Sequence, residues 1–503
     1  MGIFHNKKSL KVLFISTEAA PFAKIGGLGS VMYSLPKALV GLGYDARVLI
    51  PRYLSIDEEL HHLKIEYRDL EVPTGNEEGL EYFTCNLKRC DPSPSSEAVV
   101  TTYFLENQEY YEQRANVYGY ADDSVRWALL CRGTLEFIRQ SNSWVPDVIV
   151  SSDWQTALVS NYLKTVYAND PVLAKIATVF SIHNLFYQAM YDHRFVSEMD
   201  FDDGHSTIPG FNSPRLAKLN WMRRGIMYSD SINTVSPNYA REIMTKDYGE
   251  LLDELLRERK AVLSGILNGI DYDLWNPEDD TYIPFHYNKT DLLSRIKNKA
   301  NLQERFGLPV TKDAFMVAIV SRFSEQKGLD LLFPIADLLI QELPVQIIVV
   351  GEGDSDMMNF FHGLETRYPD KVANHLKFDP ILPHLVYAGS DVTIIPSRFE
   401  PCGLTQMEAM RMGCIPIVRK TGGLSDSVED YNPDKQTGTG FTFEKLDSSS
   451  LMIAFIRAFE NFRDKKKWQE LQKRAMAKDF SWITSAKKYA NLFVQAIGIH
   501  HKI

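Results

Sequence analysis

Two loops have residue types suited to binding a phosphorylated ligand. In the first, residues 24–29 read KIGGLG between a short apolar run and a segment of helical period. Backbone N–H groups and the positive end of a helix can face an anion there, while glycines let a ligand approach the chain closely. The spacing fits neither the dinucleotide fingerprint nor a Walker loop, so a structural glycine turn is an equally good interpretation.

The second loop, residues 320–328 (VSRFSEQKG), places Arg322 and Lys327 between a buried apolar run and a helix. Two cations in one such loop can neutralise a diphosphate without a metal ion, and ligands of open α/β sheets bind beyond the carboxyl ends of the strands. The alternative interpretation is an ordinary solvated basic loop.

Two carboxylates lie eight positions apart in residues 399–408 (FEPCGLTQME), with Glu400 in a loop and Glu408 in the early turns of a helix. A carboxylate accepts hydrogen bonds from the vicinal hydroxyls of a sugar or ribose, so the pair suits recognition of such groups. Either residue alone is also explained as a negative charge that the helix dipole favours.

His183 ends the apolar run 176–182, and Asp153 follows the apolar residues 148–150. A side chain at the carboxyl end of a strand is placed to contact a substrate. A lone histidine, however, is more often a structural residue, and the same ambiguity applies to Asp153.

These loops connect elements that alternate between strand-length apolar runs and helical periods, which predicts βαβ units on largely parallel sheets. The pattern occurs twice, so the sequence predicts two doubly wound α/β domains. Residues 57–101 are predicted to be a loop-rich insertion, residues 272–291 a connection, and residues 480–497 a helix packed on a domain surface. The strands and helices are expected at residues 12–16, 31–42, 46–50, 148–150, 156–166, 315–320, 329–339, 345–350, 392–395 and 415–418.

The composition narrows the class of protein. The 503 residues are 45% hydrophobic, enough for large cores, and 65 acidic against 55 basic residues give a formal net charge of -10. An acidic chain lacks the electrostatic footprint of a nucleic-acid binder. No apolar run is long enough for a signal peptide or a membrane span, and the five cysteines form no CxxC pair. We therefore expect a soluble, cytoplasmic protein that binds neither nucleic acid nor membrane.

Several motifs together resemble those of bacterial glycogen synthases and plant starch synthases. They occur in the order expected for that family, from residue 12 to residue 482, and so cover nearly the whole chain. The motifs are KIGGL at 24–28, IHNL at 182–185, LNGID at 267–271, SR at 321–322 with QKG at 326–328, SRFEPCGLT at 397–405, TGGL at 421–424, GTGF at 438–441 and DFSW at 479–482.

The resemblance implies the GT-B fold, in which two Rossmann-like domains face each other across a cleft. Residues 1–262 would form an acceptor (glucan) domain of the starch synthase catalytic type. Residues 263–482 would form a nucleotide-sugar domain of the glycosyltransferase group 1 type, and residues 483–503 a helix that packs back on the N-terminal domain.

The resemblance also implies the reaction: glucose moves from ADP-glucose to the non-reducing end of an α-1,4-glucan, with retention of configuration and with no cofactor or metal. The acceptor would be glycogen, starch or a maltooligosaccharide. Charge develops on the leaving diphosphate, so fixed cations would stabilise the transition state more than the ground state.

Individual roles follow from the same resemblance. Arg322 and Lys327 would hold the diphosphate, Glu400 would position the glucosyl ring, and His183 would line the reacting carbon; these four are the predicted catalytic residues. The predicted substrate-binding residues are Lys24, Gly26, Gly27, Asp153, Asn268, Cys402, Gly403, Leu404, Thr405 and Glu408.

Three positions depart from the usual family pattern. Ser30 stands where the family has Asp, and Ser152 and Gln155 stand where it has two His residues. Glu408 resembles the ribose-binding Glu of the wider class of retaining GT-B transferases. The departures at Ser30, Ser152 and Gln155 leave open a transferase with a non-polymeric acceptor. No motif identifies the base of the donor, so UDP-glucose stays an alternative, as does a non-catalytic glucan-binding or priming homologue.

Overall fold

The computed structural model describes residues 9–75, 81–93, 98–141, 143–190 and 193–502. The chain forms two compact units. The N-terminal unit comprises Met1–Val235, Ala240–Ile266 and Trp482–Ile503, and the C-terminal unit comprises Ser236–Tyr239 and Leu267–Ser481. Parts of the predicted insertion, residues 76–80 and 94–97, lie outside the described residues.

The N-terminal unit is built on a sheet of nine described strands in the order β3-β4-β5-β2-β1-β6-β7-β8-β9. All neighbouring strands from β5 to β9 are parallel, whereas β3, β4 and β5 pair antiparallel. The strands are β1 (Lys11–Ile15), β2 (Asp45–Pro51), β3 (Lys64–Pro73), β4 (Tyr82–Cys90), β5 (Thr102–Glu106), β6 (Val148–Ser152), β7 (Ala177–Ile182), β8 (Ser231–Thr234) and β9 (Leu263–Gly265).

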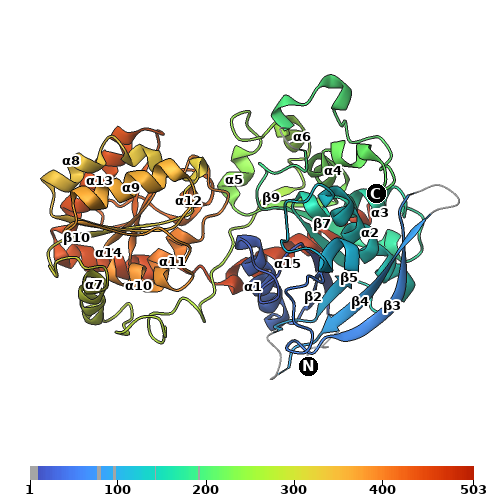
Figure 1. Cartoon of the computed structure of the whole chain (residues 1–503), viewed down its shortest axis with the longest axis horizontal. Coiled ribbons are helices and arrows are strands. Elements are labelled where there is room, and N and C mark those ends of the chain that lie inside the picture. Colours follow the sequence, from blue (N-terminus) through green and yellow to red (C-terminus); the bar gives the residue numbers. More distant parts are fainter. Residues whose placement is uncertain (1–8, 76–80, 94–97, 142, 191–192, 503) are drawn as a thin grey trace, which may run out of the picture. The chain divides into compact units, whose positions relative to one another are not determined.

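Helices on the N-terminal unit include the last helix of the chain, α15, which packs against α1 and β7 (Figure 1). Its buried face consists of residues such as Ala486, Tyr489 and Phe493, at the spacing that predicted a surface-packed helix. The helices are α1 (Gly27–Gly41), α2 (Asp123–Ser141), α3 (Leu158–Lys164), α4 (Trp221–Tyr228), α6 (Asp253–Glu258) and α15 (Trp482–His500). The short helix α5 (Pro237–Glu242) begins in the C-terminal unit and ends in the N-terminal unit.

The C-terminal unit has a parallel sheet of six described strands in the order β12-β11-β10-β13-β14-β15. Helices α8, α9 and α13 lie on one face of this sheet, and α10, α11 and α14 lie on the other (Figure 1). The strands are β10 (Phe315–Val320), β11 (Val345–Val350), β12 (Val372–His375), β13 (Val392–Ile395), β14 (Ile415–Arg419) and β15 (Phe441–Phe443). The helices are α7 (Leu293–Arg305), α8 (Ala336–Glu342), α9 (Ser355–Arg367), α10 (Leu382–Gly389), α11 (Thr405–Arg411), α12 (Gly422–Ser427), α13 (Ser448–Phe462) and α14 (Lys465–Ala477).

Both sheets have a switch point where the strand order reverses. In the N-terminal unit it lies between β1 and β6, and in the C-terminal unit between β10 and β13. Ligands of doubly wound folds bind beyond the carboxyl ends of the strands at this point. The loops that follow these four strands contain the predicted residues Lys24, Asp153, Arg322 and Glu400, so the fold brings the predicted groups to the expected edges.

Two predicted elements differ from the observed ones. The insertion at 57–101 is not loop-rich, because β3 and β4 form an antiparallel pair at the sheet edge. Half of the ten residues of β3 are exposed, which hides the strand pattern. The predicted helix at 329–339 is split into a 3-10 turn, Leu329–Leu332, and α8. Pro334 lies between the two and cannot donate a helical hydrogen bond.

The edges of the units also differ from the predicted domain limits. Leu263–Gly265 was assigned to the second domain, but as β9 it pairs with β8 and belongs to the N-terminal unit. Ser236–Tyr239 belongs to the C-terminal unit, where the Ser236 hydroxyl donates to the Pro401 carbonyl oxygen at 2.7 Å.

Candidate active site

In the C-terminal unit, an ion pair joins the two loops at the switch point. The Lys327 ammonium lies 2.6 Å from Oε2 of Glu400, and the Ser397 hydroxyl donates to the same oxygen at 3.0 Å. Oε1 of Glu400 accepts no hydrogen bond from the described residues, although Glu400 is 7% exposed. The structure thus brings together two of the predicted catalytic residues and leaves one carboxylate oxygen available to a ligand hydroxyl.

Backbone contacts hold these loops against each other. The Arg398 N–H donates to the Gln326 carbonyl oxygen at 2.8 Å, and the Gln326 side chain donates to the Phe399 carbonyl oxygen at 3.2 Å. Gly328 has φ +63°, and a Cβ there would lie 2.3 Å from the Pro396 carbonyl oxygen. Only glycine fits this close approach, which explains the glycine that follows Lys327.

Arg322 differs from Lys327 because its side chain is exposed and forms no ion pair with a described residue. Arg398, also in these loops, makes a bidentate pair with Asp330 at 2.7 and 2.8 Å. Arg322 is therefore a positive charge at the switch point that no carboxylate of the described residues neutralises, as a phosphate-binding residue would be.

The segment after Glu400 is closely packed on the start of α12. The Gly423 N–H donates to the Glu400 carbonyl oxygen at 3.0 Å, and a Cβ at Gly422 would lie 1.9 Å from that oxygen. Burial raises the pKa of the Cys402 thiol to about 12, despite the backbone N–H of Asn268 beside it. Cys402 is thus a neutral packing residue and no nucleophile near neutral pH.

The remaining predicted residues of this motif shape the start of α11. Gly403 has φ +69°, with the Gln406 side chain where a Cβ would lie, and Leu404 is the N-cap residue. Thr405 begins α11, and Glu408 lies half-buried in its first turn. Burial, with the nearby charge of Glu408 adding to it, raises the pKa of Tyr387.

Asn268 is predicted to bind the sugar, and it has an unusual feature. It is 6% exposed, yet its Oδ1 atom has no hydrogen-bond partner among the described residues. A buried amide oxygen without a partner is destabilising and calls for an explanation. A sugar hydroxyl that donates to this atom would supply one.

In the N-terminal unit, Asp153 and His183 are brought together at the ends of β6 and β7. Oδ1 of Asp153 accepts hydrogen bonds from the backbone N–H groups of His183 at 2.7 Å and Asn184 at 3.2 Å. Asp153 has φ 55° and ψ -176°, a strained conformation for a residue other than glycine. Such strain persists where surrounding contacts impose it, commonly at functional sites.

Desolvation is the main cause of the pKa shifts of both side chains. It lowers the pKa of His183 to about 4, so the imidazole is neutral near pH 7 and its Nε2 atom lies 3.2 Å from the Ser181 hydroxyl. It raises the pKa of Asp153 to about 7, against the two backbone donors, and the negative charge of Glu18 adds to the rise. Neutral His183 can exchange hydrogen bonds with a sugar hydroxyl without adding charge.

The glycine turn before α1 has both a structural contact and an exposed cation. Lys24 is exposed and makes no ion pair with a described residue, and Gly27 begins α1. However, the backbone N–H groups of Ile25 and Gly26 already donate to Oε2 of Glu18, at 2.7 and 2.9 Å. These two amides are therefore already occupied, while the Lys24 ammonium has no ion-pair partner among the described residues.

The three residues that depart from the family pattern, Ser30, Ser152 and Gln155, differ in burial and in secondary structure. Ser152 is in β6 and 1% exposed, so it packs in the sheet and cannot contact an acceptor. The hydroxyl of Ser152 and Oε1 of Gln155 are both buried without a hydrogen-bond partner among the described residues. Ser30 lies in the first turn of α1, partly buried.

Sequence reasoning missed three features of these loops. Gly351 and Gly353 follow β11, and a Cβ at either would come within 2.1 Å of a carbonyl oxygen in the Arg322 loop, a packing that the VVGEGD pattern signals. Phe378 follows β12 and is 72% exposed. Glu18 lies in the same loop as the glycine turn, but no motif marks its carboxylate as the acceptor of the turn amides.

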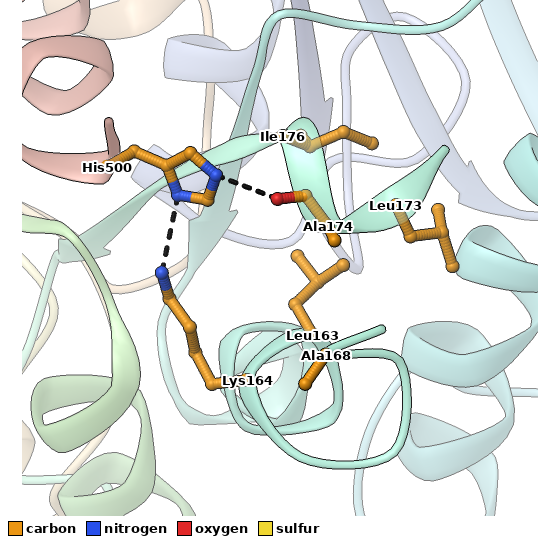
Figure 2. Close-up of a pocket in the computed structure, with 7 residues that line it drawn as sticks. All are labelled: Leu163, Lys164, Ala168, Leu173, Ala174, Ile176 and His500. Carbon is orange, nitrogen blue, oxygen red and sulfur yellow. Dashed lines mark hydrogen bonds between the residues drawn. The ribbon is translucent and has the colours of Figure 1, made fainter. Parts of the chain in front are cut away.

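A separate pocket of about 170 Å³ lies in the N-terminal unit between α3, the segment before β7 and the end of α15 (Figure 2). It contains none of the predicted site residues and is smaller than the roughly 300 Å³ at which typical ligand pockets begin. Within the described part of the chain, no group of three or more His, Cys, Asp or Glu residues is arranged to hold a metal ion. No described helix is long and apolar enough to cross a membrane.

Two doubly wound α/β domains, each with charged or polar groups at its switch point, define a glycosyltransferase with a GT-B-like fold. Comparisons with known proteins agree. Residues 11–258 match the family described as starch synthase catalytic domain, and residues 301–475 match glycosyl transferases group 1.

The similarity extends over nearly the whole chain. It is 42% identical over 495 residues to a glycogen synthase of Thermotoga petrophila, covering 97% of this chain and 99% of the relative. A glycogen synthase of Clostridium perfringens is 41% identical over 491 residues, with 97% and 99% covered. The catalytic domain of Starch Synthase IV from Arabidopsis thaliana, bound to ADP and acarbose, superposes with a TM-score of 0.83 at 33% identity, covering 98% of this chain and 100% of that one. The chain belongs to the glycogen synthase and starch synthase family, which confirms the resemblance predicted from its motifs.

Proposed function

We propose that this protein transfers glucose from ADP-glucose to the non-reducing end of an α-1,4-glucan, with retention of configuration and without a metal ion. The observation that carries the proposal is the group of residues at the C-terminal switch point: the Lys327–Glu400 pair, and Arg322, which lies in the same loop as Lys327 and has no ion pair with a described residue. The names of the glycogen synthase relatives, and the ADP and acarbose bound to the Arabidopsis relative, support the same donor and acceptor classes.

The charges suit departure of a nucleoside diphosphate. As the bond between the glucosyl carbon and the phosphate oxygen breaks, negative charge grows on the diphosphate and positive charge on the sugar. Arg322 has all its guanidinium donors available, and Lys327 uses its ammonium on Glu400 alone among the described residues. Both cations therefore stabilise the leaving group more as the reaction proceeds.

The Glu400 carboxylate, which pairs with Lys327, can accept a hydrogen bond from the glucosyl group of the donor. Glu400 shares Oε2 with Lys327 and Ser397, which leaves Oε1 to accept a hydrogen bond from a glucosyl hydroxyl. The unpaired Oδ1 of Asn268 and the neutral imidazole of His183 add two further groups that can hold hydroxyls. Glu408 on α11 is assigned to the ribose, and Lys24 to the diphosphate.

A donor panel tests the proposal. Purified protein is incubated with glycogen and either ADP-glucose or UDP-glucose, with and without excess EDTA, while nucleoside diphosphate release and glucan chain length are followed together. We expect ADP release matched by growth of α-1,4 chains, at a rate that EDTA leaves nearly unchanged. Binding of glycogen without ADP or UDP release would favour a non-catalytic glucan-binding homologue, and loss of activity in EDTA that Mg or Mn restores would overturn the metal-free mechanism.

A further inference from the structure

Glu18 lies in the loop between β1 and α1 and is 3% exposed. Its Oε2 atom accepts hydrogen bonds from the backbone N–H groups of Ile25 at 2.7 Å and Gly26 at 2.9 Å. Its Oε1 atom accepts one from the Tyr118 hydroxyl at 3.0 Å. Tyr118 is itself held by the Thr17 hydroxyl at 2.7 Å, so this carboxylate is fixed from both sides.

Burial of the Glu18 carboxylate without a cation beside it among the described residues destabilises the fold, which a residue with only a packing role would not require. Its partners are two amides and a phenol, and it forms no salt bridge with any residue that the structure describes. A buried carboxylate loses its hydration, and neutral donors alone replace it less well than a cation does. An apolar or neutral side chain at position 18 would be buried with a smaller loss of solvation free energy. A functional role therefore explains the buried carboxylate better than packing does.

The two amides that Glu18 holds belong to the turn that carries Lys24. Gly26 is the N-cap residue of α1, so Glu18 fixes the path of the chain between Lys24 and the helix. At Gly29, a Cβ would lie 3.0 Å from Oε2 of Glu18, so the carboxylate and the glycine-rich turn fit each other closely. Lys24 is left exposed, with its ammonium available.

We propose that Glu18 is a positioning residue for the donor diphosphate, acting through Lys24: it fixes the turn so that the Lys24 ammonium is held ready for the phosphates. Because Glu18 occupies the Ile25 and Gly26 amides with its own negative charge, it keeps a phosphate off these two amides and leaves the exposed Lys24 ammonium as the cation of the turn. This inference rests on the proposed function, since it requires that the ligand of Lys24 is the diphosphate of the sugar nucleotide.

The matched variants are Glu18→Ala, Glu18→Gln and Tyr118→Phe, with Glu136→Gln as a control. Glu136 is likewise a buried glutamate of the N-terminal unit, 1% exposed, but its partners are Arg139, Gln140 and Tyr167, away from the glycine turn. Each variant is measured for kcat, for KM of ADP-glucose and of glycogen separately, and for its melting temperature.

We expect Glu18→Ala to raise the KM for ADP-glucose roughly 10-fold to 100-fold, on the scale of losing a charge-assisted hydrogen-bond pair, with the KM for glycogen nearly unchanged. Glu18→Gln keeps an acceptor for the two amides and should recover most of that loss, and Tyr118→Phe should have a smaller effect in the same direction. Added formate or acetate should partly rescue Glu18→Ala by filling the vacated carboxylate site. Glu136→Gln should alter the melting temperature only.

A double-mutant cycle with Lys24→Ala makes the test decisive. If Glu18 acts through Lys24, the Glu18→Ala/Lys24→Ala protein should have the donor KM of Lys24→Ala alone. Additive effects, or a Glu18→Ala protein that melts lower with an unchanged donor KM, would overturn the positioning role. If Glu18→Ala does not fold, the same cycle is run with Glu18→Gln and Tyr118→Phe. A wild-type protein that releases no ADP from ADP-glucose would instead overturn the proposed function on which the inference rests.

Discussion

The side chains of Lys327 and Glu400 differ in how much water reaches them. The Lys327 side chain keeps 20% of its surface exposed and that of Glu400 only 9%. Removing the lysine therefore leaves a nearly buried carboxylate with one remaining donor, Ser397, whereas removing the glutamate leaves a cation that water can still reach. The pair thus contributes to folding as well as to the site, while the exposed Arg322 has no comparable structural role.

We expect Arg322→Ala to lower kcat by about 100-fold to 1,000-fold, the scale of losing one preorganised transition-state donor, with an unchanged melting temperature. Steady-state kinetics and calorimetry of the same preparation check both points. Arg305→Ala, which removes an exposed arginine at the end of α7, is the matched control and should leave kcat unchanged. If Arg322→Ala and Arg305→Ala had the same kcat, Arg322 would be an ordinary solvated loop residue without a catalytic role.

Lys327→Ala should lower kcat to a similar extent and also destabilise the C-terminal unit by about 2 to 3 kcal/mol, less than a fully buried pair because Lys327 is partly exposed. Adding Glu400→Ala to it should recover part of the stability but none of the activity, because it removes the unpaired carboxylate. Calorimetric scans of the two single variants and the double variant measure this coupling. A double variant that is less stable than Lys327→Ala would contradict it.

The sequence predicted several site residues individually but not the contacts between them. Lys327, Glu400, Asp153 and His183 were predicted because their types are unusual at the ends of apolar runs. That Lys327 pairs with Glu400, and that Asp153 holds the His183 backbone, depends on loops that are distant in sequence. Glu18 was missed for another reason: it lies in the same loop as the glycine turn, but no spacing rule indicates that its carboxylate accepts from the Ile25 and Gly26 amides.

At the scale of elements, buried parallel strands were predictable and edge strands were not. The bounds of β10, β11 and β13 equal the predicted ranges, because strands covered on both faces are continuous apolar runs. The strand β12 (VANH) carries two polar residues, and β15 has three residues only, so neither gives a pattern of useful length. The exposed residues of β3 likewise conceal the strand, since pairing with β4 decides its conformation.

The end of α15 is held on the N-terminal unit by a histidine. His500 contacts Oδ2 of the buried Asp230 at 3.1 Å and the Ala174 carbonyl oxygen at 3.0 Å, and Figure 2 shows it beside Lys164. The hydrogen bond to Asp230 is the main cause that raises the pKa of His500, against desolvation and the charge of Lys164. The pKa of Asp230 is lowered, so Asp230 stays ionised throughout the range in which His500 titrates.

The resulting pH dependence has a definite sign. A folded pKa above the ordinary 6.5 means that protonated His500 stabilises the fold fully below about pH 6.5, and that this stability is lost as pH rises through the folded pKa. We expect His500→Gln to lower stability by about 1 to 2 kcal/mol at pH 6, the scale of a hydrogen bond to a charged group, and by less at pH 9. Thermal scans across this range measure it, with the neighbouring, exposed His501→Gln as control. A deficit that does not shrink as pH rises would contradict the assignment.

At the scale of the whole molecule, the two units give two separate predictions for the two substrates. Most of the proposed donor groups, Lys24 and His183 excepted, lie in loops of the C-terminal unit, while the N-terminal unit corresponds to the predicted acceptor domain. A ligand stabilises the unit that binds it, by about 2.7 kcal/mol at a ligand concentration of 100 Kd. Because a chain of two units need not unfold in one step, the effect must be measured locally and not from a single melting temperature.

Hydrogen exchange of the wild-type protein, measured by mass spectrometry, provides that local measurement. ADP should slow amide exchange in residues 321–328 and 397–405, which follow β10 and β13. A maltooligosaccharide should instead slow exchange in residues 153–157 and 183–188, which follow β6 and β7, because ligands bind beyond the carboxyl ends of these strands. Arg322→Ala should weaken the effect of ADP and leave that of the maltooligosaccharide intact. Protection of the β6 and β7 loops by ADP, without protection of residues 321–328, would show that donor and acceptor have been assigned to the wrong units.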